Sequence, residues 1–177
     1  PSPHGTPYAI NKYCAELYTR YYATYHNVPA VSLRLFNAYG PHELAGKYRN
    51  VIPRFIENAL FDRDLIITGT GDETRDFTFV NDAVRGLLMA AKCPFFQGET
   101  YNIGSGRQTT IRDLASLIVE ITGSRSVVST VPRRDWDDVE IRYANLSRAS
   151  ADLGYAPQTD LREGLERTIA WYKEQIK

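Results

Sequence analysis

Short apolar segments alternate with amphipathic segments along almost the whole chain. The apolar runs are rich in Val, Ile, Leu and Phe, and between them apolar residues recur at helical spacing. This alternation predicts an α/β fold built around a parallel sheet. The predicted strands are 30–36, 65–68, 75–80, 100–106 and 127–132, and the predicted helices are 7–26, 50–61, 81–93, 110–122 and 159–176.

Three of the predicted helices carry signals at their first residues. Thr110 is followed three positions later by Asp113, and Asp160 stands in the same relation to Glu163. A pair with this spacing can satisfy backbone N–H groups of the first turn. Pro7 falls in the first turn of the 7–26 helix, where a missing N–H costs nothing.

Composition excludes several classes of protein. Lys and Arg number 21, as do Asp and Glu, so the formal net charge of +0 argues against a general nucleic-acid surface. No apolar run approaches the roughly 18 residues that a membrane span needs. Cys14 and Cys93 lack metal-like spacing and are expected to be buried free thiols in a reducing cytosol. His4, His26 and His42 form no metal-binding pattern, and no metal is expected.

The segment PYAINKYCAE places Tyr8 one helical turn before Lys12. Such a pair is often no more than two neighbours on a helix surface. It can also be an acid–base group: a free phenol, with a pKa of about 10, reacts poorly at neutral pH. A nearby ammonium favours the phenolate, and a helix N-terminus acts in the same direction.

Several blocks resemble, in order, the extended short-chain dehydrogenase/reductases, that is, the NAD-dependent nucleotide-sugar epimerases and dehydratases such as UDP-glucose 4-epimerase. YAINKYCAE is similar to the family's Tyr-x-x-x-Lys helix. A Tyr-x-x-x-Lys motif alone is a weak signal, whereas ordered blocks are strong. The other blocks are LRLFNAYGP, RNVIPRFI, GTGDETRDFTFVNDAVRG, YNIGSGRQTTIRDLA and RRDWDDVEIRYANLSRASADLGYAP.

The resemblance implies the C-terminal part of a Rossmann-type parallel sheet plus a small α/β substrate domain. Residues 1–40 would end the dinucleotide-binding domain, and 41–177 would be mainly the substrate-binding domain, with segments near 75–106 returning to the Rossmann part. The family's Gly-rich loop and catalytic Ser or Thr would lie upstream of Tyr8. The start PSPHGTPY looks like a cut through a larger protein.

The resemblance also implies roles for individual residues. Tyr8 and Lys12 would be catalytic and, with Phe36, would contact NAD, which the upstream half would mainly bind. The implied substrate-binding residues are Asn37, Asn50, Val51, Arg75, Arg134 and Asp137.

Each of these residues also has a purely structural interpretation. Asn37 could serve only as a turn residue, and Asn50 as a helix N-cap. Arg75 could pair with Asp72 or Asp76. Arg134 and Asp137 could form an ion pair within a loop.

The function favoured by the resemblance is a UDP-sugar 4-epimerase that oxidises sugar C4 transiently. Alternatives within the family are a nucleotide-sugar 4,6-dehydratase and a UDP-glucuronate decarboxylase. An alternative of another class is a non-catalytic protein that binds nucleotide sugars. The implied setting is a cytoplasmic homodimer that pairs through the Tyr–Lys helix, without a nucleic-acid or membrane partner.

Overall fold

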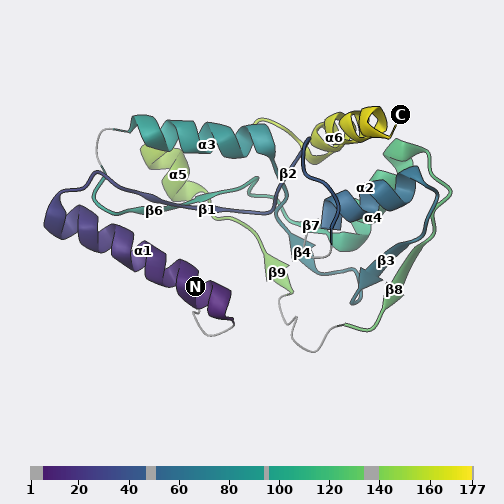
Figure 1. Cartoon of the computed structure of the whole chain (residues 1–177), viewed down its shortest axis with the longest axis horizontal. Coiled ribbons are helices and arrows are strands. Elements are labelled where there is room, and N and C mark those ends of the chain that lie inside the picture. The colour runs from purple at the N-terminus through teal and green to yellow at the C-terminus, as the bar shows by residue number, and fades with distance from the viewer. Residues whose placement is uncertain (1–5, 47–50, 94–95, 134–139, 177) are drawn as a thin grey trace.

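The structure is a computed structural model that describes residues 6–46, 51–93, 96–133 and 140–176. Figure 1 shows helices on both sides of small β-sheets. The helices are α1 (Pro7–His26), α2 (Val51–Leu60), α3 (Val80–Lys92), α4 (Ile111–Thr122), α5 (Ser147–Leu153) and α6 (Leu161–Gln175). The strands are β1 (Ser32–Leu35), β2 (Ala38–Tyr39), β3 (Leu65–Thr68), β4 (Thr74–Arg75), β5 (Thr78–Phe79), β6 (Thr100–Ile103), β7 (Thr109–Thr110), β8 (Val128–Val131) and β9 (Ile141–Arg142).

Strand pairing is mostly parallel, as the alternation of strands and helices predicts. β1 pairs with β6, with Ser32 opposite Thr100 and Leu35 opposite Ile103. β2 pairs with β5 and β3 with β8, also in parallel. β4 lies between β9, which is parallel to it, and β7, which is antiparallel. The predicted α/β class is confirmed.

Two hydrophobic clusters hold these layers together. One is buried among α2, α4, α6 and the strands beside them, and includes Ile56, Leu114 and Leu165. The other lies between the β1–β6 pair and the helices α3 and α5, and is centred on Tyr101 and Ile103. In Figure 1, α1 covers the face of this pair opposite to α3 and α5.

The helix starts follow the local sequence signals. The side chains of Thr110 and Asp160 accept hydrogen bonds from the backbone N–H groups of Asp113 and Glu163, as predicted. α1 has an N-cap that the sequence analysis did not identify, since the Thr6 hydroxyl accepts from the N–H of Ala9 at 3.1 Å.

One predicted strand is wrong, because the segment 75–80 forms two short strands. β4 pairs with β7 and β9, whereas β5 pairs with β2. Between them lies Asp76, whose side chain is fully buried and bonded to other segments. Asp76 therefore lies where the chain leaves the sheet of β4 and enters the sheet of β5.

The expected burial of the two cysteines is also corrected. Cys14 is exposed and Cys93 is half-buried, although both are free thiols as expected. β1 is only half-buried, and Leu35 at its end is 47% exposed. Cys14 is exposed and β1 is only half-buried because α1 packs sparsely, since Ala23 is its only buried residue in the described part of the chain.

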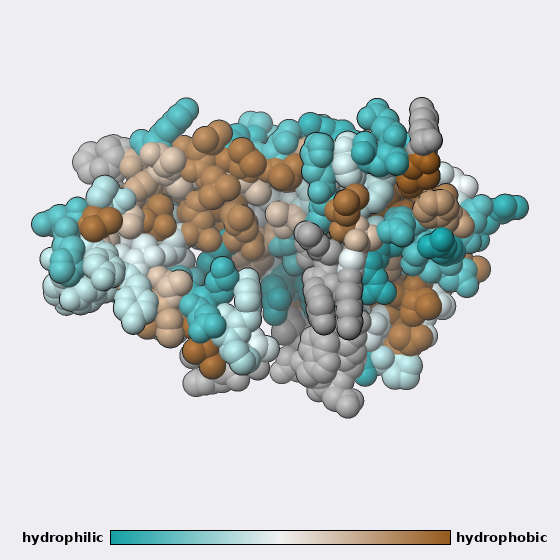
Figure 2. Space-filling view, viewed as in Figure 1, coloured by the Kyte–Doolittle hydropathy of each residue, from teal (hydrophilic) through white to brown (hydrophobic). Residues whose placement is uncertain are grey.

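Apolar and aromatic side chains remain on the surface of this half-covered layer. Tyr21, Tyr22, Tyr25 and His26 on α1 contact one another through their rings while exposed to solvent. Figure 2 shows further apolar surface over α3, where Val84, Leu87 and Leu88 are exposed. None of the helices in the described part of the chain has the length and apolar character needed to cross a lipid bilayer.

The exposed tyrosines and the uncovered edge of β1 predict that the 177-residue chain self-associates. We expect light scattering to show a mean mass that rises with concentration. Replacing Tyr18 and Tyr22 of α1 by Lys should lower that mass. The control is Tyr143→Lys, a change of a half-exposed tyrosine that lies just after β9. A chain that stays monomeric at every concentration would contradict the prediction.

Candidate active site

The Tyr8–Lys12 pair lies at the first turns of α1 and faces a cavity. The Lys12 ammonium nitrogen is 5.6 Å from the centroid of the Tyr8 ring, so the two side chains share one face of the helix. The cavity has a volume of about 670 Å³ and is bounded by α1, by Leu33 and Leu35 of β1, and by Arg142 of β9. Tyr8 is 72% exposed, so its hydroxyl is open to a ligand.

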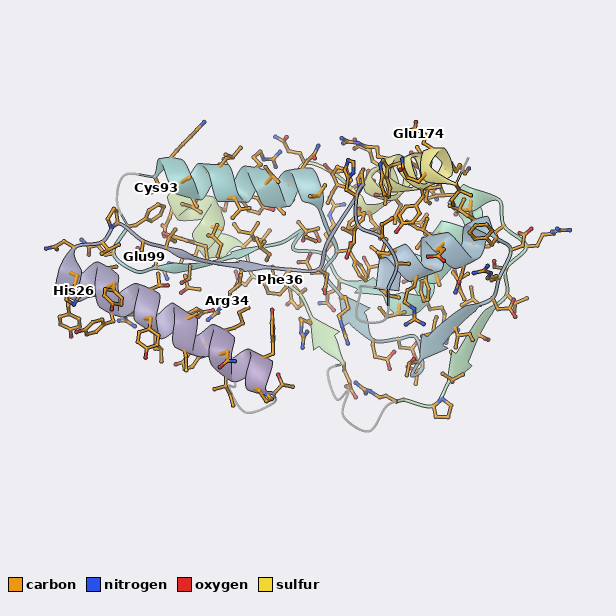
Figure 3. The ribbon with its side chains drawn as sticks, viewed as in Figure 1. His26, Arg34, Phe36, Cys93, Glu99 and Glu174 are labelled. Atoms are coloured by element: carbon orange, nitrogen blue, oxygen red, sulfur yellow. The ribbon has the colours of Figure 1, made fainter. Side chains whose placement is uncertain are left out.

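An ion pair ties α1 to β1 two turns further along the helix. Arg34 donates from Nε to Glu16 Oε1 at 2.7 Å and from Nη2 to Glu16 Oε2 at 2.5 Å. This double hydrogen bond raises the pKa of Arg34, against the opposing effect of burial. Figure 3 labels Arg34 on β1 facing α1. No local pattern predicts this pair, because Glu16 and Arg34 are 18 positions apart in the sequence.

The carboxyl ends of β1 and β6 meet at one edge, where ligands bind in parallel sheets. Phe36 follows β1, and its N–H donates to the carbonyl of Ile103 at the end of β6. Asn37 comes next with φ of 22°, a left-handed conformation that Asn tolerates. Its side-chain amide donates to the backbone oxygen of Asp76 at 3.0 Å. Asn37 is thus a turn residue, and its role toward a substrate stays a prediction.

Asp76 is the most heavily bonded side chain at this edge. Its carboxylate, which is 0% exposed, accepts from Ser105 N at 2.7 Å, Ser105 Oγ at 2.6 Å, Gly106 N at 2.9 Å and Ala144 N at 3.0 Å. These donors come from the turn after β6 and from the segment after β9. The sequence analysis named Asp76 only as a possible partner of Arg75 and did not predict that its carboxylate is buried.

Arg75 immediately precedes this buried carboxylate in β4. One guanidinium nitrogen, Nη1, donates to the carbonyl of Thr74 at 2.9 Å and to that of Glu140 at 3.4 Å. The other suggested partner, Asp72, lies 4.0 Å from Arg112 Nε. Because β4 pairs with β9, Arg75 stands opposite Arg142, which lines the Tyr8–Lys12 cavity.

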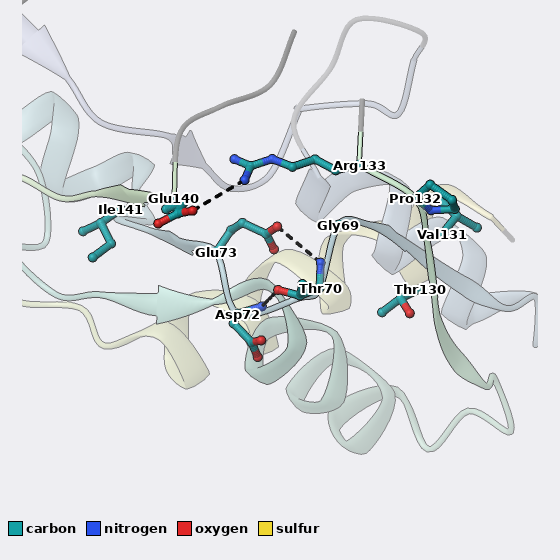
Figure 4. Close-up of a pocket in the computed structure, with 10 residues that line it drawn as sticks. All are labelled: Gly69, Thr70, Asp72, Glu73, Thr130, Val131, Pro132, Arg133, Glu140 and Ile141. Atoms are coloured by element: carbon teal, nitrogen blue, oxygen red, sulfur yellow. Dashed lines mark hydrogen bonds and ion pairs between the residues drawn. The ribbon is translucent and has the colours of Figure 1, made fainter. Parts of the chain in front are cut away.

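A second cavity lies beside β3 and β8 and has a volume of about 700 Å³ (Figure 4). Glu73 is buried at its wall, where its two carboxylate oxygens accept the N–H groups of Thr70 at 3.3 Å and Gly71 at 2.9 Å. Burial alone would raise the pKa of Glu73, but these bonds and the charge of Arg133 leave it lowered. Arg133 Nη1 is 3.9 Å from Glu140 Oε1 on the same wall.

The other predicted site residues divide into two groups. Val51 is the first residue of α2. Asn50, Arg134 and Asp137 lie outside the described residues, so their predicted roles are not tested. Among the residues that the structure describes, no three His, Cys, Asp or Glu side chains are grouped so that they could hold a metal ion.

Comparison with known proteins identifies the family. The model of the "NAD dependent epimerase/dehydratase family" matches residues 1–104. The chain belongs to this family. The resemblance that the sequence blocks carry is therefore confirmed.

Family members with solved structures share the fold closely. The epimerase Mth375 of Methanothermobacter thermautotrophicus is 44% identical with a TM-score of 0.93, over 97% of this chain and 51% of that one. The Bordetella bronchiseptica enzyme WbmF, solved with NAD+ and UDP, is 37% identical with a TM-score of 0.86, over 99% and 56%. These neighbours confirm a Rossmann-type α/β fold, of which this chain covers about half.

Curated relatives also match this chain over about half of their own length, but they are enzymes with different reactions, including a decarboxylase and a dehydratase. The UDP-N-acetyl-alpha-D-glucosaminuronate decarboxylase of Bacillus cytotoxicus is 35% identical over 94% of this chain and 53% of its own length. The chain therefore spans about half the length of the family members that it matches.

The hydrogen bonds to Asp76 predict that its charge stabilises the fold. In Asp76→Asn, an amide NH2 would face the N–H groups of Gly106 and Ala144. We expect the free energy of unfolding, measured in urea, to fall by about 3 kcal/mol, the cost of leaving buried donors unsatisfied.

The matched control is Asp72→Asn, four residues earlier, whose side chain is 78% exposed. Its free energy of unfolding should change by less than about 0.5 kcal/mol. Equal effects of the two substitutions would show that the Asp76 network does not stabilise the fold.

Proposed function

We propose that this chain supplies the Tyr–Lys helix and the substrate-binding half of an NAD-dependent nucleotide-sugar epimerase, most specifically a UDP-sugar 4-epimerase. The observation that carries the proposal is the shared face of Tyr8 and Lys12 at the wall of an open cavity beside the carboxyl end of β1. In this assignment residues 1–40 end the dinucleotide-binding domain. Residues 41–177 are mainly the substrate-binding domain, and segments near 75–106 return to the Rossmann part.

The chemistry of the cavity fits a nicotinamide cofactor and a sugar. Lys12 has no carboxylate within ion-pair distance among the described residues, so its donors remain for a ribose hydroxyl and for the phenolate. Leu35 and Phe36 offer an apolar contact for the nicotinamide ring. When bound, NAD would accept a hydride from the sugar and return it.

The chain's own residues perform the proton transfer in this proposal. Tyr8, as phenolate, accepts the proton of the sugar hydroxyl while the carbon is oxidised, and returns it on reduction. Lys12 stabilises the negative oxygen of the phenolate. The diphosphate binds Asn37, Asn50, Val51 at the start of α2, and Arg75.

Two further residues would complete the nucleotide site. Arg134 would contact the diphosphate by a charge-assisted hydrogen bond, and Asp137 would accept from the nucleoside ribose. Both assignments come from the family pattern. The upstream half of the protein would mainly hold NAD.

Two alternatives use the same residues. A nucleotide-sugar 4,6-dehydratase or a UDP-glucuronate decarboxylase would begin with the same oxidation. The similarity to a dehydratase and to a decarboxylase supports keeping both alternatives. A binding protein without turnover would keep the nucleotide site but not depend on Tyr8. Product analysis separates the enzymes, and turnover separates them from the binding protein.

We also propose a cytoplasmic homodimer that pairs through α1. The free cysteines fit a reducing compartment. The exposed tyrosines of α1 fit a helix-to-helix contact. A nucleic-acid partner is not part of the proposal, because the chain has no net charge.

The catalytic assignment predicts that Tyr8→Phe, in the complete protein, removes nearly all turnover while leaving UDP binding unchanged. Only the proton-transferring hydroxyl is lost. Lys12→Met should lower turnover and weaken NAD binding. The control is Tyr25→Phe on the same helix, since Tyr25 is also 72% exposed. Wild-type turnover in the Tyr8 variant would disprove the acid–base role.

The substrate assignment predicts that Arg75→Ala and Arg134→Ala weaken UDP binding by about 1.5 to 3 kcal/mol each, the range for a hydrogen bond to a charged group. Isothermal calorimetry on the complete protein measures this loss. Arg125→Ala, beyond the end of α4, should leave the affinity unchanged. Unchanged affinity in both variants would reject the proposed diphosphate site.

A further inference from the structure

Glu16 lies where it could compete for the Lys12 ammonium. It follows Lys12 by four residues on α1, as Lys12 follows Tyr8, and all three side chains line the same cavity. Oppositely charged side chains with this spacing attract each other on a helix surface. A free Glu16 carboxylate would therefore draw the ammonium away from Tyr8.

In the structure Arg34 binds both oxygens of this carboxylate. Its Nε and Nη2 bond the two oxygens of Glu16 at 2.7 and 2.5 Å, which is a paired geometry that a single ammonium cannot match. The contact is half-buried, since the side chains of Arg34 and Glu16 are 33% and 19% exposed. Lys12 instead lies over the ring of Tyr8.

We propose that Arg34 is a positioning residue that withholds Glu16 from Lys12 and so reserves the ammonium for Tyr8. The role of the ammonium rests on the proposed function, whereas the competition itself is a property of this chain. Among the described residues Arg34 forms its side-chain hydrogen bonds and ion pair with Glu16, not with Tyr8 or Lys12, so it acts through Glu16.

None of the other charged or titratable residues lining this cavity in the described part of the chain can compete with Tyr8 for the Lys12 ammonium as Glu16 could. Tyr13 lines the cavity from α1, and Arg142 lines it from β9. Arg142 carries the same charge as the Lys12 ammonium and repels it. Among the described residues lining this cavity, Glu16 is thus the only carboxylate.

The direct test is a crystal structure of the 177-residue Arg34→Met chain. We expect Lys12 Nζ to move from the Tyr8 ring to ion-pair distance of the Glu16 carboxylate. In the double variant Arg34→Met/Glu16→Gln it should return to Tyr8. If Lys12 keeps its position in Arg34→Met, the proposal is wrong.

The second test is the pH profile of turnover in the complete protein. In Arg34→Met the acid limb should shift upward by about one pH unit, the lower end of the effect of one neighbouring charge. Activity below that limb then falls about tenfold. Adding Glu16→Gln should restore the wild-type limb, because the competing carboxylate is gone.

Further variants separate this role from loss of stability. Arg34→Lys keeps a cation beside Glu16 and should retain most of the wild-type profile. Arg162→Met removes another ion pair between two elements, to Glu120 at 2.8 Å between α6 and α4, and should leave the limb in place. Glu16→Gln alone should show the wild-type limb even if Arg34→Met folds poorly.

A shifted limb in Glu16→Gln, or no restoration in the double variant, would overturn the proposal. If Tyr8→Phe instead retains full turnover, the proposed function fails. In that case the position of Lys12 in the crystal structure still decides whether Arg34 withholds Glu16.

Discussion

The buried carboxylate of Asp76 is the interaction on which the arrangement of this chain depends. It joins β4 and β5 to the turn after β6 and to the segment after β9, through bonds to Ser105, Gly106 and Ala144. An isolated buried charge is very costly, so these segments must meet for the fold to be stable. Gly104 belongs to the same network, because a Cβ there would lie 2.8 Å from Asp76 Oδ2 and 2.6 Å from the Ala144 side chain.

The same residue connects the fold to the candidate site. The backbone oxygen of Asp76 accepts the Asn37 amide, and Arg75 precedes it in β4. Two residues proposed to bind a diphosphate are thus held next to the same buried residue. α1 is placed by different contacts, namely the Arg34–Glu16 pair and the close approach of Gly98, where a Cβ would lie 2.6 Å from the Arg20 Cα.

Local signals in the sequence predicted the elements that depend on local physics. The Thr110 and Asp160 caps, the Pro7 start of α1 and the apolar strand 65–68 all agree with the structure. The two-residue strands β2, β7 and β9 were not predicted, since they are too short for any periodicity. They are strands only because a distant segment pairs with each of them.

The site could be predicted where a motif is contiguous, and not where it depends on distant segments. Tyr8 and Lys12 are one helical turn apart, so helix geometry alone brings them together. Asp76 and Ala144 are 68 positions apart in the sequence, and Glu16 and Arg34 are 18 positions apart. No local sequence pattern therefore predicts either contact. Burial of Cys14 was predicted wrongly because helix periodicity does not tell how much of α1 is covered.

The central claim is that Asn37, Arg75 and the start of α2 bind a nucleoside diphosphate. A crystal structure of this chain with UDP tests it most directly. The account predicts the diphosphate within hydrogen-bond distance of the Asn37 amide, the first-turn N–H groups of α2 and the Arg75 guanidinium. UDP bound away from all three, or no bound UDP at millimolar concentration, would contradict it.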